Sequence, residues 1–149
     1  MNRPTVICKA AADLRLPPNL IDYAATRAVF SWEAVRAELA GLPGGGLNVA
    51  HETVERHSSG ACRDKIAFRF LGANTTRDIR YGELSRLTNR FANVLKSLGI
   101  GKGERLFLLS GRIPELYVTV LGSFKNGTAV SPLFSAFGPE PVRVRLAKS

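Results

Sequence analysis

The side chains that most often do chemistry are few in this chain and poorly grouped. His51 and His57 are six residues apart, so on a helix they would point to different faces and make a poor chelating pair. Ser58 and Ser59 lack the Gly-x-Ser-x-Gly context of a nucleophile elbow, and Cys62 lies in a turn with no base beside it. We therefore predict no catalytic residue and no metal site within this chain.

Two glycine-rich stretches look like phosphate-binding loops but have the wrong context. "GIGKGE", which holds Gly99, Gly101 and Gly103, follows a predicted helix and precedes a predicted strand. A dinucleotide loop needs the opposite order, because the amino end of the following helix must meet the phosphate. The triplet at residues 44–46 lacks the Lys-Ser/Thr pair of a phosphate loop. Both stretches are predicted to be turns.

An aromatic stretch near the end of the chain is the remaining candidate site. "SPLFSAFGPEP" follows a short apolar run at Ala129 and Val130 and precedes a basic helix that begins at about Glu140. It is predicted to be a strand-to-helix loop at the carboxyl end of a parallel strand, where α/β sheets tend to place ligands. We interpret it as a loop that borders a binding path and not as an active site.

The first half of the chain predicts a mostly helical start followed by a hairpin. Residues 19–39 have a largely helical pattern with Ser31 as an N-cap, and "GLPGGGLN" then breaks the chain. Asn48 is predicted to cap a short helix that ends at His57. The alternating stretch "KIAFRFLG" and a return strand at residues 79–81 predict a β-hairpin. Its richer apolar face is predicted to hold Ile66, Phe68 and Phe70.

The second half alternates helices and strands. A long helix is predicted to start at Tyr81 and end at Gly99, and "ERLFLLS" predicts a parallel strand covered on both faces. Pro114 is predicted to open a second helix that Gly127 closes, and "TAVSPL" to form a strand that Pro132 ends. The apolar stripe of the long helix is predicted to consist of Leu84, Leu87, Phe91, Leu95 and Leu98.

This order of elements is typical of a doubly wound α/β sheet, preceded here by a helical segment and a β-hairpin. Two parallel strands cannot bury both faces of a sheet, and the last helix has no strand after it. We therefore expect an incomplete sheet and a chain that is a fragment of a longer protein.

Composition is that of a globular domain with an excess of positive charge. Of the 149 residues, 45% are hydrophobic and 22% are charged, and the formal net charge is +9. The 21 Lys and Arg residues are spread along the chain, which does not favour a specific nucleic-acid partner. No apolar run approaches the ~20 residues of a membrane helix, and no secretory signal is apparent. Because Cys8 and Cys62 are too isolated for a disulfide framework, we expect a cytoplasmic protein.

A resemblance to a known family covers roughly residues 30–146. The stretch "YGELSRLTNRFANVLKSLGIGKGERLFLLSGRIPELYVTVLGSFKNGTAVSPLFSAFGPEPVRVRL" resembles the N-terminal region of AMP-forming acetyl-CoA synthetases, within the acyl-adenylate-forming superfamily. "LNVAHETVERH" with "DKIAFRFLG" is similar to their upstream segment, and "PLFSAFGPEP" points to the acetyl-CoA synthetase branch. One departure is Arg80, because family members often have a capping Thr at that place.

The resemblance implies the fold and the domain organisation. The expected fold is the N-terminal part of the large domain of an adenylate-forming enzyme. The predicted domains are an N-terminal helical extension with a Gly-rich linker (1–47) and a truncated AMP-binding domain (48–149).

The resemblance also implies an acetate–CoA ligase as the complete protein. In this family acetate attacks the α-phosphate of ATP to give acetyl-adenylate and pyrophosphate, and the thiol of CoA then displaces AMP. The first step uses a phosphate loop, Mg²⁺ and a lysine of a mobile C-terminal domain, none of which is recognisable in this sequence. The chain alone is therefore expected to be inactive and to bind ATP, CoA and Mg²⁺ weakly. The implied partners are acetate, ATP and CoA, without a membrane or a specific nucleic acid.

The family places the loop after the second parallel strand along the wall where CoA approaches. The resemblance therefore makes Phe134, Ser135, Ala136 and Phe137 the candidate CoA-binding residues. A purely structural role, with both phenylalanines packed under neighbouring helices, is the alternative. Two other functions stay open, namely a non-catalytic stand-alone remnant or interaction module and, less favoured, a basic nucleic-acid-binding domain.

Overall fold

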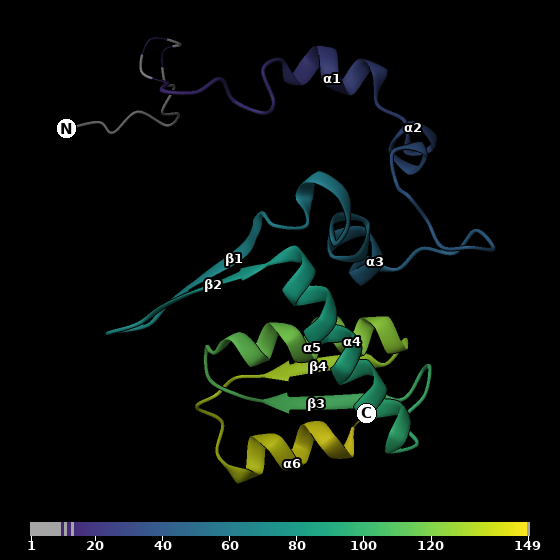
Figure 1. Cartoon of the computed structure of the whole chain (residues 1–149), viewed down its shortest axis with the longest axis vertical. Helices are drawn as coiled ribbons and strands as arrows, with labels where there is room; N and C mark the ends of the chain where they lie inside the picture. Colours follow the sequence, from purple (N-terminus) through teal and green to yellow (C-terminus); the bar gives the residue numbers. More distant parts are fainter. Residues whose placement is uncertain (1–9, 11, 13, 149) are drawn as a thin grey trace. The chain divides into compact units, whose positions relative to one another are not determined.

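The computed structural model describes residues 10, 12 and 14–148, which belong to two compact units, Met1–Leu39 and Ala40–Ser149 (Figure 1). The predicted boundary at residue 47 marks the start of a family domain, whereas these two units are defined by compactness. The boundary at residue 47 therefore stays a prediction.

The first unit contains two short helices, α1 (Tyr23–Val29) and α2 (Trp32–Ala37). The side chain of Ser31 caps α2 by accepting a hydrogen bond of 3.0 Å from the backbone N–H of Ala34, as predicted. Extended backbone at Phe30 and Ser31 divides the predicted helical stretch into these two pieces. Neither helix buries a residue, so packing contributes little to their stability.

The second unit opens with a glycine-rich turn and short helical segments. Gly41, Gly44 and Gly45 have positive φ angles, which end regular structure as predicted. Asn48 caps α3 (Val49–Thr53) by accepting hydrogen bonds from two backbone N–H groups. Two 3₁₀ turns follow, η2 (Glu55–His57) and η3 (Gly60–Cys62).

The predicted hairpin is present, and it is longer than predicted. Strand β1 (Ile66–Leu71) pairs antiparallel with β2 (Thr76–Arg80), which starts three residues before the predicted return strand. The register shifts between Ile66 and Phe68, so the strict alternation expected along β1 is interrupted there. As a result Ile66 is exposed, whereas Phe68 packs against the core.

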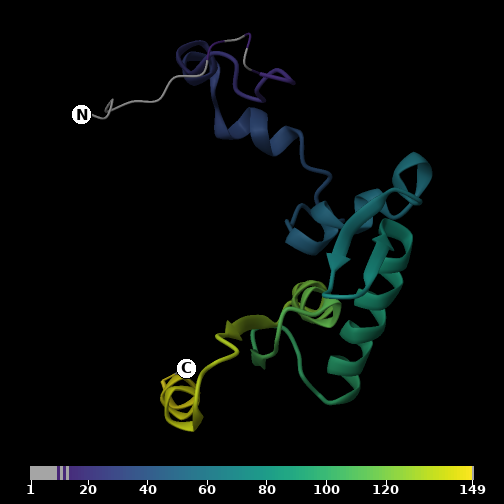
Figure 2. The same cartoon turned by 90° about the vertical axis from the view of Figure 1, so that its left-hand side faces the viewer.

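Helices and strands alternate along the rest of the unit, as predicted. The elements are α4 (Tyr81–Ser97), β3 (Arg105–Leu109), α5 (Pro114–Asn126), β4 (Ala129–Leu133) and α6 (Pro139–Ala147). Strands β3 and β4 pair in parallel, with α5 on one face of the pair and α6 on the other (Figures 1 and 2). This is the expected incomplete α/β arrangement, in which helices cover a two-stranded parallel sheet.

The parallel strands differ from their predicted form in two details. Pro132 does not end β4, because the strand continues through it to Leu133 and Pro132 pairs with Leu108. A proline is tolerated there because β4 has a free edge in this two-stranded sheet. In β3 only the three central residues are half-buried and both end residues are exposed, so two-sided cover is partial.

The buried face of α4 is rotated from the predicted stripe. Leu84 and Leu95 are buried as predicted, but Leu98 is 68% exposed and the contact face contains small side chains. These are Ser85, Thr88 and Ala92. Helix α5 contributes Gly122 to the contact, where an added Cβ would lie 2.9 Å from the backbone oxygen of Thr88. The two helices therefore pack closely through small residues.

The apolar core joins five parts of the second unit. Val54, Ile79 and Leu84 are almost completely buried and come from the segment after α3, from β2 and from α4. Partly buried side chains of β1 and α5 pack around them, namely Ala67, Phe68, Val118 and Leu121. The hairpin is thereby fixed to the helix pair.

Substituting Gly122 with alanine tests the close helix contact. We expect Gly122→Ala to lower the free energy of unfolding by about 1–2 kcal/mol, because the new methyl group overpacks against Thr88 and Phe91 despite its better helix propensity. Gly111→Ala is the control, since nothing lies within 4 Å of a Cβ at that position. Urea unfolding followed by circular dichroism measures both, and equal stabilities of the two variants would contradict the close contact.

Candidate functional site

The candidate loop lies where the carboxyl ends of β3 and β4 meet (Figure 1). Leu133, the last residue of β4, is buried and anchors it. The backbone N–H of Phe137 donates a hydrogen bond of 2.9 Å to the carbonyl oxygen of Phe134, which closes a turn over residues 134–137. The two phenylalanine rings meet edge to face with centroids 5.6 Å apart.

The two phenylalanines have different environments. The guanidinium of Arg145 lies 4.1 Å from the ring centroid of Phe137, a cation–π contact that holds this ring against α6. The side chain of Phe134 is 64% exposed. The small residues Ser135 and Ala136 are also exposed. The alternative in which both phenylalanines pack under neighbouring helices therefore describes Phe137 only. The ring of Phe134 is exposed and does not pack under a helix.

Helix α6 adds a paired charge beside the loop. Arg143 donates two hydrogen bonds, of 2.8 and 2.7 Å, to the carboxylate of Glu140. These hydrogen bonds keep the pKa of Glu140 below its ordinary value, so the carboxylate stays ionised and the pair stays intact near neutral pH.

A shallow apolar groove of about 470 Å³ runs between this loop, α6 and the end of β3. Its lining residues are Leu109, Phe137, Gly138, Pro139, Val142, Arg143 and Leu146. An exposed aromatic ring next to an apolar groove can stack on a planar group and shelter an alkyl chain. The loop contains neither a nucleophile with a base nor, among the described residues, a metal-ligand set.

The histidines and the described cysteine that the sequence analysis singled out lie outside the candidate loop. His57 packs against Tyr81 with ring centroids 5.2 Å apart, while His51 lies in α3. Within the described residues no group of three or more His, Cys, Asp or Glu side chains is arranged to hold a metal ion. Cys62 lies in η3 and is a free thiol, and Cys8 lies outside the described residues.

The stretch with Gly99, Gly101 and Gly103 forms the tight connection between α4 and β3. Gly99 and Gly103 have positive φ angles, and the N–H of Gly103 donates a hydrogen bond of 2.9 Å to the carbonyl of Gly127. Because β3 begins after this turn, the turn lies at the amino end of the sheet, away from the edge that holds the candidate loop. The predicted turn is confirmed.

Sequence reasoning missed a polar cluster between α4, α5 and η2. The ammonium of Lys125, whose side chain is 9% exposed, pairs with the carboxylate of Glu55. It also donates hydrogen bonds to the backbone oxygen of Ser85 at 3.2 Å and to the side chain of Asn89 at 2.9 Å. The hydroxyl of Ser85 donates a further hydrogen bond of 2.7 Å to Glu55. The only local hint of a shared polar partner was the spacing of Ser85 and Asn89, which are four residues apart on one helix.

The polar cluster changes the titration of Glu55. Burial raises the pKa of this carboxyl, but the hydrogen bonds from Lys125 and Ser85 outweigh burial and lower the pKa overall. The ionised form is thus favoured in the folded protein, which makes the cluster a structural element that depends on pH.

Taken together, the second unit is an α/β unit whose strand-to-helix loop borders an apolar groove. The chain matches the family model described as "AMP-binding enzyme" over residues 54–149, and it belongs to that family.

Relatives and a solved structure agree with this family assignment. The chain is 34% identical over 132 residues to the acetyl-coenzyme A synthetase of Bacillus subtilis (strain 168), covering 88% of this chain and 23% of that one. It is 40% identical over 105 residues to the acetyl-coenzyme A synthetase of Methanothrix thermoacetophila, covering 69% and 16% of the two chains.

The crystal structure of an acyl-CoA synthetase from Brucella canis superposes on the chain with a TM-score of 0.78 at 33% identity. The superposition covers 85% of this chain and 23% of that one. The fold therefore matches the N-terminal part of an adenylate-forming enzyme, as predicted. The chain spans about a quarter or less of the length of these relatives. In the described part of the chain, no helix is long and apolar enough to cross a membrane.

Replacing Lys125 tests the polar cluster. We expect Lys125→Met to lower the free energy of unfolding by about 1–2 kcal/mol at pH 7, because Glu55 loses its main partner but is exposed enough to recover water. Lys96→Met, at an exposed position of the same fold, is the matched control and should change stability little. Urea unfolding measures both variants.

The same pair of variants tests the pH dependence. A lowered pKa in the folded state gives stability that is present above the ordinary value of 4.5 and is lost as the pH falls through the lower folded value. Between pH 7 and pH 3, wild type and Lys96→Met should therefore lose more stability than Lys125→Met. Parallel curves for all three proteins would refute the assignment to Glu55.

Proposed function

We propose that this chain forms part of an AMP-forming acetate–CoA ligase. The observation that carries the proposal is the family match over residues 54–149, joined with relatives that are named acetyl-coenzyme A synthetases. In the proposed reaction a carboxylate oxygen of acetate attacks the α-phosphorus of ATP, and the bond to the pyrophosphate oxygen breaks. The sulfur of CoA then attacks the carbonyl carbon of acetyl-adenylate, and AMP leaves.

We assign the loop at residues 134–137 to the wall along which CoA approaches. Three features of the loop support this role. Phe134 presents an exposed ring, the turn fixes the position of that ring, and the apolar groove beside it suits an alkyl chain. Ser135 and Ala136 are small enough to let a ligand lie close to the backbone of the turn. Phe137 acts as the support of Phe134 through their edge-to-face contact.

The residues described here take no part in bond making or breaking under this proposal. They contain no three-ligand group for a metal, so Mg²⁺ is assigned to none of them. A basic excess spread over the surface attracts anionic substrates such as ATP and CoA in a general way. We propose a cytoplasmic location, where these substrates are found together.

A chimera tests both the family reaction and the loop. In it, this chain replaces the matching segment of the Bacillus subtilis acetyl-coenzyme A synthetase, and acetate-dependent formation of AMP is measured. We expect activity from the chimera with wild-type sequence. Phe134→Ala should raise the KM for CoA about tenfold, since loss of one stacked ring costs roughly 1–3 kcal/mol.

The two half-reactions separate a role in CoA binding from a loss of folding. Acetate-dependent exchange of pyrophosphate into ATP does not involve CoA, so Phe134→Ala should leave it unchanged. Phe30→Ala removes another exposed aromatic ring outside the loop and should alter neither half-reaction. An equal loss of both half-reactions in Phe134→Ala would contradict the assignment to CoA.

The 149-residue chain on its own should be inactive. We expect no acetate-dependent pyrophosphate exchange from it and CoA binding weaker than about millimolar, because one loop wall without its opposite side leaves most of a ligand in water. Isothermal titration calorimetry with CoA, and an exchange assay with labelled pyrophosphate, check this expectation. Micromolar binding of CoA would show that the loop is a sufficient site.

A further inference from the structure

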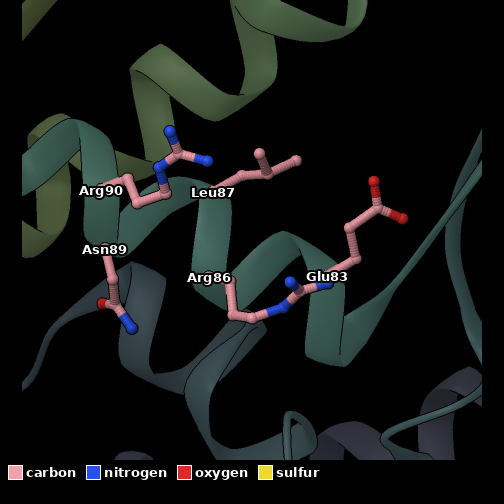
Figure 3. A pocket seen from close by; sticks show the side chains of 5 residues that line it. All are labelled: Glu83, Arg86, Leu87, Asn89 and Arg90. Carbon is pink, nitrogen blue, oxygen red and sulfur yellow. The ribbon is translucent and has the colours of Figure 1, made fainter.

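A second surface feature lies on the exposed side of α4, away from the loop at the strand ends. One hollow of about 430 Å³ is lined by residues of this helix alone (Figure 3). These residues are Glu83, Arg86, Leu87, Asn89 and Arg90. A second hollow of about 360 Å³ is lined by Arg63, Asp64, Arg80, Gly82, Glu83 and Arg86. The two hollows share Glu83 and Arg86 as lining residues, and together they are here called the α4 groove.

Three arginines line the α4 groove at a regular spacing. An ideal Cβ on Gly82 would lie 2.9 Å from Cγ of Arg63 and 3.3 Å from its Nε. The side chain of Arg63 thus occupies the place of the side chain that position 82 lacks. Positions 82, 86 and 90 are four residues apart, so successive side chains lie about one helical turn, roughly 5–6 Å, from each other. Arg63, Arg86 and Arg90 form a row along the helix.

The charges of this row are not neutralised within the described residues. All three arginines are exposed, and no carboxylate of the described chain forms an ion pair with any of them. Other cations nearby are engaged, since Arg80 donates to the backbone oxygen of Asp64 and Arg77 lies 3.5 Å from Glu83. A row of free guanidiniums at helical spacing is complementary to carboxylates at the same spacing.

The remaining lining residues favour a protein partner over a nucleic acid. The carboxylates of Glu83 and Asp64 also line the groove, but four arginines outnumber them, so the surface stays net positive. No aromatic side chain lines either hollow within the described residues, so bases have nothing to stack on. Half-buried Leu87 instead offers an apolar contact between the arginines.

We propose that the α4 groove binds an acidic helical segment of a partner protein. The segment carries carboxylates at every fourth residue, which meet Arg63, Arg86 and Arg90, and an apolar side chain that covers Leu87. The inference does not depend on the reaction of the complete enzyme, because none of these residues belongs to the candidate loop.

A designed peptide provides the probe. It is a fluorescently labelled alanine-based helix with glutamate at every fourth position and one central leucine, and a second peptide has the same composition with the glutamates scrambled. We expect the patterned peptide to bind the 149-residue chain more tightly than the scrambled one by about fivefold or more in fluorescence anisotropy. Binding should weaken as salt is raised from 20 to 200 mM, because exposed ion pairs are screened.

Charge reversal identifies the surface. Arg86→Glu with Arg90→Glu should weaken binding of the patterned peptide about tenfold, because like charges then face each other. Lys96→Glu with Lys148→Glu makes the same change in net charge outside the groove and should bind as wild type does. Circular dichroism verifies that both double variants are folded. A peptide with lysine in place of glutamate should bind the Arg86→Glu, Arg90→Glu variant better than it binds wild type.

Several outcomes would overturn the proposal. They are the absence of binding by wild type, equal affinity for the patterned and scrambled peptides, and equal losses in the two double variants. A single-stranded oligothymidylate that binds more tightly than the patterned peptide, and whose binding the groove variant abolishes, would identify the surface as a nucleic-acid site instead. If the groove variant does not fold, the milder Arg63→Ala variant still tests the proposal. It should weaken binding of the patterned peptide and leave binding of the scrambled peptide unchanged.

Discussion

The close contact between α4 and α5 is the constraint on which the rest of the second unit depends. Gly122 has no side chain, so the backbone of α5 approaches Thr88 and Phe91 of α4 within van der Waals distance. The hydroxyl of Thr88 is buried in this contact and donates to the carbonyl oxygens of Leu84 and Ser85 in its own helix, which satisfies it without a partner across the interface. Since α5 is also the crossover between β3 and β4, fixing it on α4 fixes where the parallel strands can pair.

Polar bonds then attach the segment before the hairpin to this helix pair. The amide of Asn48 donates a hydrogen bond of 2.7 Å to the carbonyl of Phe124 near the end of α5, and Lys125 next to it pairs with Glu55. Few apolar side chains are buried here, so area alone would leave the position of this segment poorly defined. An ion pair with a buried lysine often adds little net stability, but it penalises every arrangement that leaves Lys125 without a partner. We infer that the cluster specifies the position of α3 and η2 more than it stabilises them.

Most elements could be predicted from the sequence because their signals are local. Ser31 and Asn48 cap their helices, and Gly99 and Gly127 end theirs with positive φ angles. The face of α4 could not be predicted in this way, because periodicity ranks Leu above Ser, Thr and Ala, whereas the glycine of a distant helix selects the small residues. The partner of Lys125 is 70 residues away in the sequence, which no local pattern encodes. The prolines and the glycine around residues 134–137 predicted a loop there, and the structure has one. The contact of Arg145 with Phe137 could be found only from the folded structure.

The order of the candidate loop has an energetic consequence for binding. An exposed aromatic side chain normally samples several rotamers, and fixing such a side chain at an interface costs about 0.5–1.5 kcal/mol. Here the turn hydrogen bond and the ring of Phe137 restrict Phe134, and the cation–π contact with Arg145 restricts Phe137. The chain itself supplies these restraints, so part of the ordering cost is met before a ligand arrives. Such a fixed aromatic surface is what the proposed function asks of a binding wall.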